Sequence, residues 1–225
     1  MKFDFVPASE IDAILENELG ASLARKGFLI RSPRAYVRSR IPKIRDLIII
    51  QPMKGASYAP CWGFSLDFVP HISRDALRWH RTDRSARLDL RFDPLDYLYP
   101  GSSEFNQWTI DSARGTRTAR KDIRRITTML SKQAEAFFAQ VQGEPDLLPA
   151  FQREAAREAV RFNFYNYSQQ PIAYAFILAR LGDLDSAKAE LEKACAMHDA
   201  SVTVRQRLKE MIGQFAADPQ GSPDA

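Results

Sequence analysis

Apolar residues recur at helical spacing near the start of the chain. A stripe repeating every three to four residues consists of Ile11, Ile14, Leu15, Leu19 and Leu23. Ser9 stands where an N-cap hydroxyl would accept hydrogen bonds from the first turn. Gly27 stands where a chain leaves a helix through positive φ. The pattern predicts a helix from Ser9 to about Lys26.

The period then changes to two, which predicts strands. In residues 34–41, apolar side chains alternate with Arg34, Tyr36, Arg38 and Arg40, so we expect one basic strand face. Residues 44–51 are apolar almost throughout, as in a central strand covered on both faces. Residues 62–69 and 87–93 alternate like half-buried strands, and 104–111 reads as a further strand. Residues 73–80 read as a short helix, and 52–60 and 94–103 as loops.

After Asp111 the helical period returns and persists. It predicts a long amphipathic helix over about 118–142, and further helices over about 146–161, 171–181, 184–197 and 202–216. The polar residues 218–225 suit a disordered tail. Most connections between the strands are too short for helical crossovers, so the sheet should be mainly antiparallel.

These elements together predict the α+β class. We expect an N-terminal helix, a mainly antiparallel sheet of about five to six strands, a long helix packed on the sheet, and a helical C-terminal half. Residues 1–142 would form the α+β domain, and residues 143–217 a helical region packed on it.

Charge is distributed unevenly along the chain. Residues 1–132 carry 23 basic and 15 acidic side chains, a net charge of +8, whereas residues 133–225 carry 9 and 13, a net charge of −4. The basic half could meet nucleic acid or an acidic protein. The first residues lack the basic-then-apolar order of a signal peptide, and no apolar run approaches a membrane span. We therefore expect a cytoplasmic protein that has no membrane partner.

Two basic clusters are candidates for a binding surface. The strand cluster comprises Arg34, Tyr36, Arg38 and Arg40, and a tyrosine among arginines is the combination that stacks on bases and binds phosphates. The helix cluster comprises Arg117, Lys121 and Arg124, on the helix face away from Ile123 and Ile126. Basic side chains in a first turn oppose the helix dipole at a cost of about 0.3–1 kcal/mol, which an anionic partner would offset. Solvation of an exposed sheet face explains the strand arginines without any partner.

The residues that commonly carry catalysis or bind metals form no motif here. His71, His80 and His198 lack metal-ligand spacing, and two cysteines cannot build a paired-cysteine zinc site. Cys61 and Cys195 suit reduced, buried thiols. Asp89 and Asp93 alternate with arginines, which favours charge balance over catalysis. We predict no catalytic residue, no metal and no cofactor.

Short segments of the α+β part resemble a mostly bacterial family catalogued as a domain of unknown function, family 4304. The residues concerned are Gly27-Phe28, Arg38, Ile50-Gln51, the segment 62–68 and Trp108-Thr109-Ile110. The resemblance implies the order helix, sheet, helix over about residues 8–140, and no general activity. Some relatives look like immunity proteins associated with polymorphic toxins. Separately, "AYAFILARLGDLDSAKAELEKA" (173–194) is similar to one tetratricopeptide-type hairpin, although an array needs several repeats.

Three functional hypotheses follow. The first is a non-enzymatic, immunity-like interaction module that presents a basic face to an acidic protein partner. The second is a nucleic-acid-binding protein that uses both basic clusters. The third is a hydrolase or nuclease whose site is assembled from scattered residues. The oligomeric state is left open by the sequence.

Overall fold

The N-terminal helix forms as expected, with an irregularity in its middle. The computed structural model describes residues 4–73 and 76–217. It contains α1 (Ala8–Leu15), the π-helical turn η1 (Glu16–Gly20) and α2 (Ala21–Ala24) as one continuous helical rod. Gly27 follows with φ +83°, as predicted. The expected cap is wrong, because the helix begins one residue earlier, after Pro7, and has no side-chain cap.

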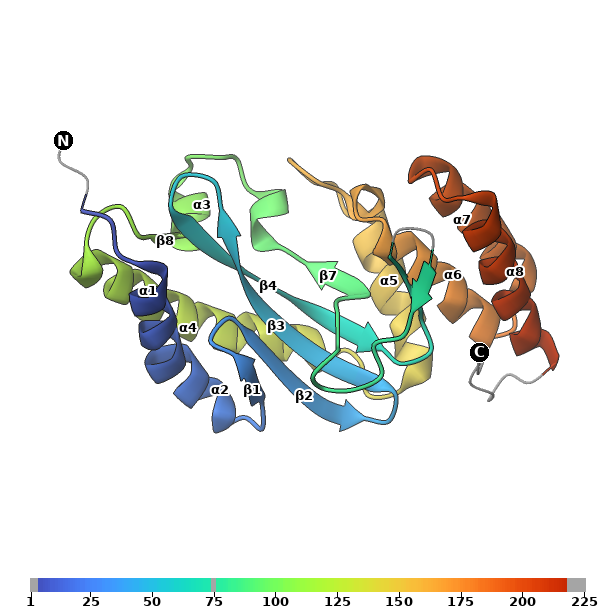
Figure 1. Cartoon of the computed structure of the whole chain (residues 1–225), viewed down its shortest axis with the longest axis horizontal. Helices are drawn as coiled ribbons and strands as arrows, with labels where there is room; N and C mark the ends of the chain where they lie inside the picture. Colours follow the sequence, from blue (N-terminus) through green and yellow to red (C-terminus); the bar gives the residue numbers. More distant parts are fainter. Residues whose placement is uncertain (1–3, 74–75, 218–225) are drawn as a thin grey trace.

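The sheet is antiparallel and has six strands. Its order is β1 (Leu29–Ser32), β2 (Ala35–Ile41), β3 (Ile44–Met53), β4 (Ser57–Leu66) and β7 (Leu90–Phe92), with β8 (Ile110–Asp111) paired to β4. The short turns β2–β3 and β3–β4 make neighbouring strands antiparallel, which confirms the predicted fold class. Figure 1 shows the long β3–β4 pair running through the centre of the molecule.

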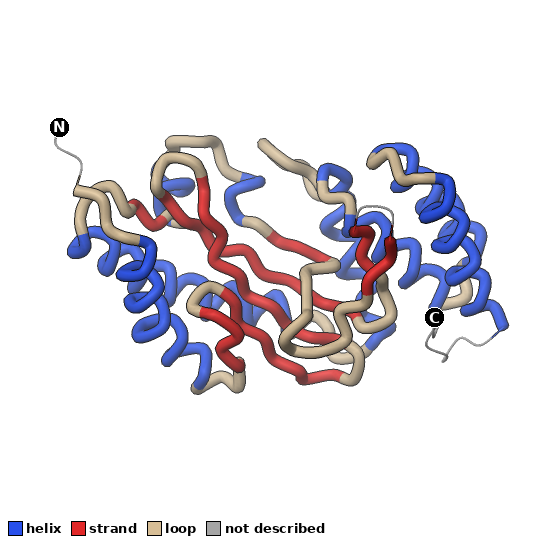
Figure 2. Tube along the Cα trace, viewed as in Figure 1, coloured by secondary structure: helices blue, strands red, loops and turns tan. Residues whose placement is uncertain are grey.

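Two of the short-element predictions are wrong. Where a short helix was expected over 73–80, β5 (His71–Ser73) and β6 (Ala76–Arg78) pair as antiparallel strands. Residues 103–107 form the helix α3 (Ser103–Gln107), because the Ser102 hydroxyl caps it by accepting from Phe105 N–H at 3.1 Å. Of the strand expected over 104–111 only β8 is present. Figure 2 shows these short segments around the main sheet.

The strand β4 is covered on both faces, so its expected half-burial is wrong. It begins at Ser57, inside the predicted loop 52–60, and every residue from Tyr58 to Leu66 is buried. One face packs on helices through Trp62 and Phe64. The other lies beneath the segment 79–89, whose Ala86 packs with Val37 and Leu47.

The long helix α4 (Thr116–Phe138) covers the first face of the sheet, as predicted. Its Phe137 and Phe138 rings lie 5.3 and 5.7 Å from the Phe64 ring. Offset aromatic contacts of this kind add about 0.5–1.5 kcal/mol beyond the burial of apolar area. Figure 1 shows α4 passing behind the sheet, with α1 at the left against α4.

The C-terminal half is helical and packs against the end of the sheet. It consists of α5 (Leu147–Ala156), α6 (Gln169–Arg180), α7 (Leu184–Met197) and α8 (Val202–Ala217). The 3-10 turns η3 (Glu144–Asp146) and η4 (Phe164–Asn166) precede α5 and α6, and a further turn, η2 (Pro94–Tyr97), follows β7. The hairpin α6–α7 forms where the tetratricopeptide-like segment lies, and α6 is almost wholly buried. Its Gln170 side chain accepts from the outward N–H of Arg91 at 3.2 Å, beside the free edge of β7.

One apolar cluster runs from Val6 to Phe215, through both parts of the chain. The division at residues 142 and 143 stays a prediction, and the tail 218–225 lies outside the described residues. Among the described residues, no helix is both long and apolar enough to cross a membrane.

The β4–β7 contact predicts a strict requirement for glycine at position 63. A Cβ atom there would lie 1.8 Å from the carbonyl oxygen of Leu90. We expect Gly63→Ala to lower the free energy of unfolding by about 2–3 kcal/mol, because the two strand backbones must separate.

Gly213→Ala is the matched control, since it lies in α8 with no atom within 4 Å of the added methyl. It should raise stability by about 0.5–1 kcal/mol. Urea denaturation followed by circular dichroism measures both changes, and a neutral Gly63→Ala would contradict the close strand contact.

Candidate functional site

Most of the strand cluster faces the helices, and its arginines are paired with acidic side chains, so it does not form the expected solvated basic face. Arg38 donates to the buried Asp46 carboxylate at 2.9 Å, to Glu135 of α4 at 3.0 Å and to the carbonyl of Lys26 at 3.0 Å. Its guanidinium lies 4.3 Å from the centre of the Phe28 ring. Arg38 therefore joins the sheet to α4 and to the end of the N-terminal helix.

The other members of the strand cluster have structural partners too. Arg40 donates to Asp46 at 2.6 Å and to the carbonyl of Phe138 at 2.9 Å. Arg34 pairs with Asp12 of α1 at 2.5 Å. Tyr36 is 1% exposed and its hydroxyl donates to the carbonyl of Pro33. A base could not stack on this ring.

The Arg38 contacts predict that this arginine is required for stability. We expect Arg38→Met to lower the free energy of unfolding by roughly 2–3 kcal/mol, because Asp46 then keeps its buried charge with one arginine fewer. Arg117→Met, the same change on an exposed helix face, should stay within about 0.5 kcal/mol of the parent. Equal stabilities of the two variants in urea would refute a structural role for Arg38.

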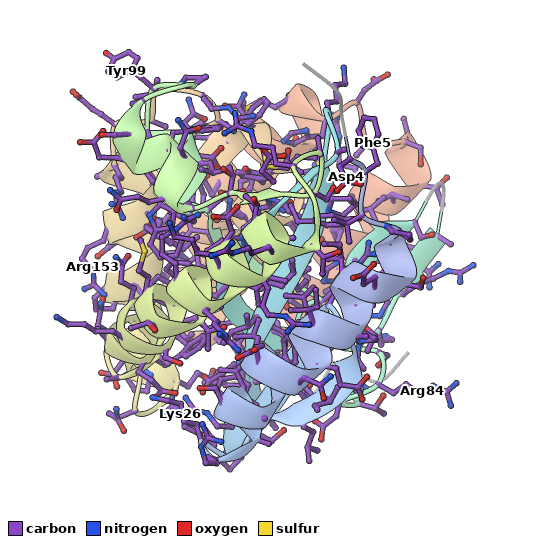
Figure 3. The ribbon with its side chains drawn as sticks, turned by 90° about the vertical axis from the view of Figure 1, so that its left-hand side faces the viewer. Asp4, Phe5, Lys26, Arg84, Tyr99 and Arg153 are labelled. Atoms are coloured by element: carbon purple, nitrogen blue, oxygen red, sulfur yellow. The ribbon has the colours of Figure 1, made fainter. Side chains whose placement is uncertain are left out.

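The helix cluster is exposed, as predicted, and is larger than expected. Arg117, Arg120, Lys121 and Arg124 all lie on the surface of α4 and line a shallow groove of about 590 Å³. The first turn of α4 holds no acidic residue. Figure 3 shows this side of the molecule, with α1 and α4 in front of the sheet. We call these four residues the α4 surface.

Only one member of the α4 surface forms an ion pair with another described residue. Arg124 pairs with Glu18 at 2.8 Å, and this partner holds the pKa of Glu18 below its usual value. Arg117, Arg120 and Lys121 have no such pair within residues 4–73 and 76–217, although the charge of Arg120 also lowers the pKa of Glu18. Three cations on two helical turns are thus left to solvent or to a partner.

The two basic clusters do not form one surface. Arg34 contacts the N-terminal helix at Asp12, and Arg124 contacts its η1 turn at Glu18. The two clusters therefore contact the same helical rod through different acidic residues, and most of the strand cluster is turned inward. Of the two basic clusters, the α4 surface is the one whose side chains are all exposed.

The cysteines and histidines give no nucleophile and no metal site. Cys61 and Cys195 are free and buried, as expected, and burial raises the pKa of the Cys61 thiol to about 12. His71 lies 3.0 Å from the buried carboxylate of Asp89, and its ring meets the His80 ring edge-on. Burial, followed by the neighbouring His71, lowers the pKa of His80. Within the described residues no three ligand side chains converge on a possible metal position.

A polar pocket that the sequence did not suggest opens at the end of β3. It measures about 630 Å³, and its inner wall is formed by Gln51, Arg91, Asp93, Asp96 and Tyr167. Asp89 and Asp93 were expected to balance the strand arginines; both are buried, at 1% and 4% exposure, and Asp93 pairs with Arg91.

Arg91, Asp93 and Gln51 form one hydrogen-bonded group in this pocket. Arg91 donates to Asp93 at 2.7 Å and to Gln51 at 2.6 Å, and the Gln51 amide donates to Asp93 at 2.6 Å. The Arg91 guanidinium also lies 4.9 Å from the centre of the Tyr167 ring. These hydrogen bonds hold the Arg91 side chain in place, and the Asp93 carboxylate balances its charge.

Asp96 is the buried acid of this pocket that keeps one oxygen available. It is 3% exposed, and its Oδ2 accepts from the Tyr167 hydroxyl at 2.5 Å. Its Oδ1 accepts no hydrogen bond from the described part of the chain. Burial raises the pKa of Asp96 to about 6; the charge of Asp93 acts in the same direction, whereas the Tyr167 hydrogen bond, Arg91 and Arg161 oppose the rise. A strongly perturbed carboxyl in a pocket marks a candidate functional site.

The raised pKa of Asp96 predicts how stability depends on pH. Between pH 3.8 and about 6 the folded protein keeps a proton that the unfolded chain has lost. Stability from this group is therefore present at low pH, falls as the pH rises through this window, and is lost above pH 6.

Asp96→Asn removes the buried charge and keeps an acceptor for Tyr167. We expect it to raise the free energy of unfolding by about 1 kcal/mol at pH 7.5 and to leave it nearly unchanged at pH 4. Urea titrations at both pH values measure this difference. A loss of stability at pH 7.5 would show that the Asp96 charge is well compensated.

Comparisons with protein-family models, with curated proteins and with solved structures find no match to this chain. The likeness to the domain of unknown function and to a tetratricopeptide-type hairpin therefore stays a prediction.

Proposed function

We propose that the protein is a non-enzymatic interaction module whose α4 surface binds an acidic protein partner. The observation that carries the proposal is the set of exposed cations of this surface, of which Arg117, Arg120 and Lys121 have no acidic partner in the described residues. The cations span the eight residues from Arg117 to Arg124, a rise of about 10 Å along the helix. An acidic helix or loop is matched in length and charge to such a surface.

The dipole of α4 supports an anionic partner. Its first turn, residues 116–119, contains Arg117 and no acidic residue, so this cation is disfavoured by about 0.3–1 kcal/mol until a negative group approaches. Rim charges of this kind act mainly on the rate of association and on its salt dependence. An immunity-like role, in which such a surface meets an acidic region of a toxin, belongs to the same proposal.

A protein is favoured over nucleic acid as the partner because the α4 surface holds no aromatic side chain. Single-stranded nucleic acid is bound by cations together with rings on which bases stack. Tyr36, the ring expected to do this, is buried.

Affinity capture from native lysate, with and without nuclease, tests the proposal. The parent should retain one stoichiometric acidic protein irrespective of nuclease, and Arg117→Glu/Lys121→Glu should weaken its capture at least tenfold. Raising the salt concentration should weaken capture as well, because exposed charges are screened.

The matched control is Arg84→Glu/Lys188→Glu, which makes the same change in charge at exposed positions away from α4. Figure 3 shows Arg84 projecting at the far side from α4. Capture should be unaffected in this control. Equal loss in both variants, or nucleic acid as the retained material, would contradict the proposal.

A further inference from the structure

We propose that the pocket at the end of β3 binds a free purine nucleotide, with the ring directed to Asp96 and the phosphate held at the rim. The inner wall, the rim and the aromatic side chains of the pocket each match one part of such a ligand. This site is separate from the α4 surface, because the two share no lining residue.

The inner wall offers an acceptor to a hydrogen-bond donor. Asp96 lines the pocket and is only 3% exposed. Its Oδ1 atom has no hydrogen-bond partner among the described residues. A carboxylate oxygen at the wall of a pocket accepts charge-assisted hydrogen bonds, and a ring N–H or amino group would supply one. Asp93 cannot serve in this way, because Arg91, Gln51 and the N–H of Leu95 already donate to it.

The rim offers two cations to an anion. Lys54, in the β3–β4 turn, and Arg161, after α5, both line the pocket and are exposed. Neither forms a salt bridge with another residue in the described ranges. A phosphate can lie between such side chains without displacing an existing carboxylate.

Aromatic side chains lie between these two regions. Phe162 is 47% exposed, and its ring lies 6.3 Å from the Tyr167 ring, whose hydroxyl reaches Asp96. The Arg161 guanidinium lies 5.4 Å from the centre of the Phe162 ring. A planar ring can stack on Phe162 while its polar edge points to Asp96.

The segment that carries Arg161 and Phe162 is fixed over the pocket by its backbone. The N–H groups of Val160 and Arg161 both donate to the carbonyl of Asp96, at 2.7 and 3.0 Å. The rim is thereby held at a fixed place relative to the acid. A volume of about 630 Å³ lies within the range of small-molecule sites, about 300–1,000 Å³.

Calorimetric titration of the full chain with guanosine 5′-monophosphate (GMP) tests the proposal, because the guanine ring presents an N–H donor for the Oδ1 atom of Asp96. GMP should bind at submillimolar concentration, and guanosine and inorganic phosphate each at least tenfold more weakly. Asp96→Asn should weaken GMP binding at least tenfold. Lys54→Glu, an exposed change that leaves the core intact, should weaken GMP strongly and guanosine little.

The α4 variant Arg117→Glu/Lys121→Glu serves as the control and should bind GMP like the parent, which separates this inference from the proposed function. Absence of binding by both GMP and adenosine 5′-monophosphate at 5 mM overturns the inference. Phosphate binding as tight as that of GMP overturns the role of the ring. Tighter binding of a guanosine-containing RNA tetramer than of GMP overturns the assignment of a free nucleotide.

Discussion

The buried carboxylate of Asp46 is the interaction on which the arrangement of the molecule depends. It lies on β3 at 1% exposure and accepts from Arg38 and Arg40 of the neighbouring strand. Each arginine then reaches a helix: Arg38 contacts Glu135, and Arg40 contacts the carbonyl of Phe138. A buried charge requires partners with good geometry. The need to satisfy Asp46 therefore fixes β2, β3 and the C-terminal half of α4 relative to one another.

Local sequence patterns correctly predicted the long helices and strands. They failed where contacts between distant parts of the chain determine the burial or the secondary structure of a segment. The helices over 118–142, 184–197 and 202–216 and the antiparallel order follow from period and connection length. Alternation correctly put Arg38 on one strand face, but it cannot tell whether that face meets water or a helix carrying Glu135, about 100 residues later. Likewise, Ser102 looked like loop composition, whereas its hydroxyl begins a helix.

The candidate sites divide in the same way. The α4 surface lies within two turns of one helix, so its spacing is visible in the sequence. The pocket at the end of β3 depends on Gln51, Asp96 and Tyr167, which come from separate parts of the chain. No spacing rule links such positions. The available signal was weak: aspartates in "RFDPLDY" and aromatic residues in "FNFYNY", each ordinary when considered alone.

The hydrogen bond from Arg91 N–H to Gln170 prevents a strand of another molecule from pairing with the outer edge of β7. A strand edge with unpaired N–H groups is a template for pairing with another chain. At β7 this edge is occupied by the side chain of a buried residue of α6, so a second molecule finds no free donor there. The helical half thus blocks intermolecular strand addition at this edge. At the opposite edge, the four-residue strand β1 is instead too short to offer a long template.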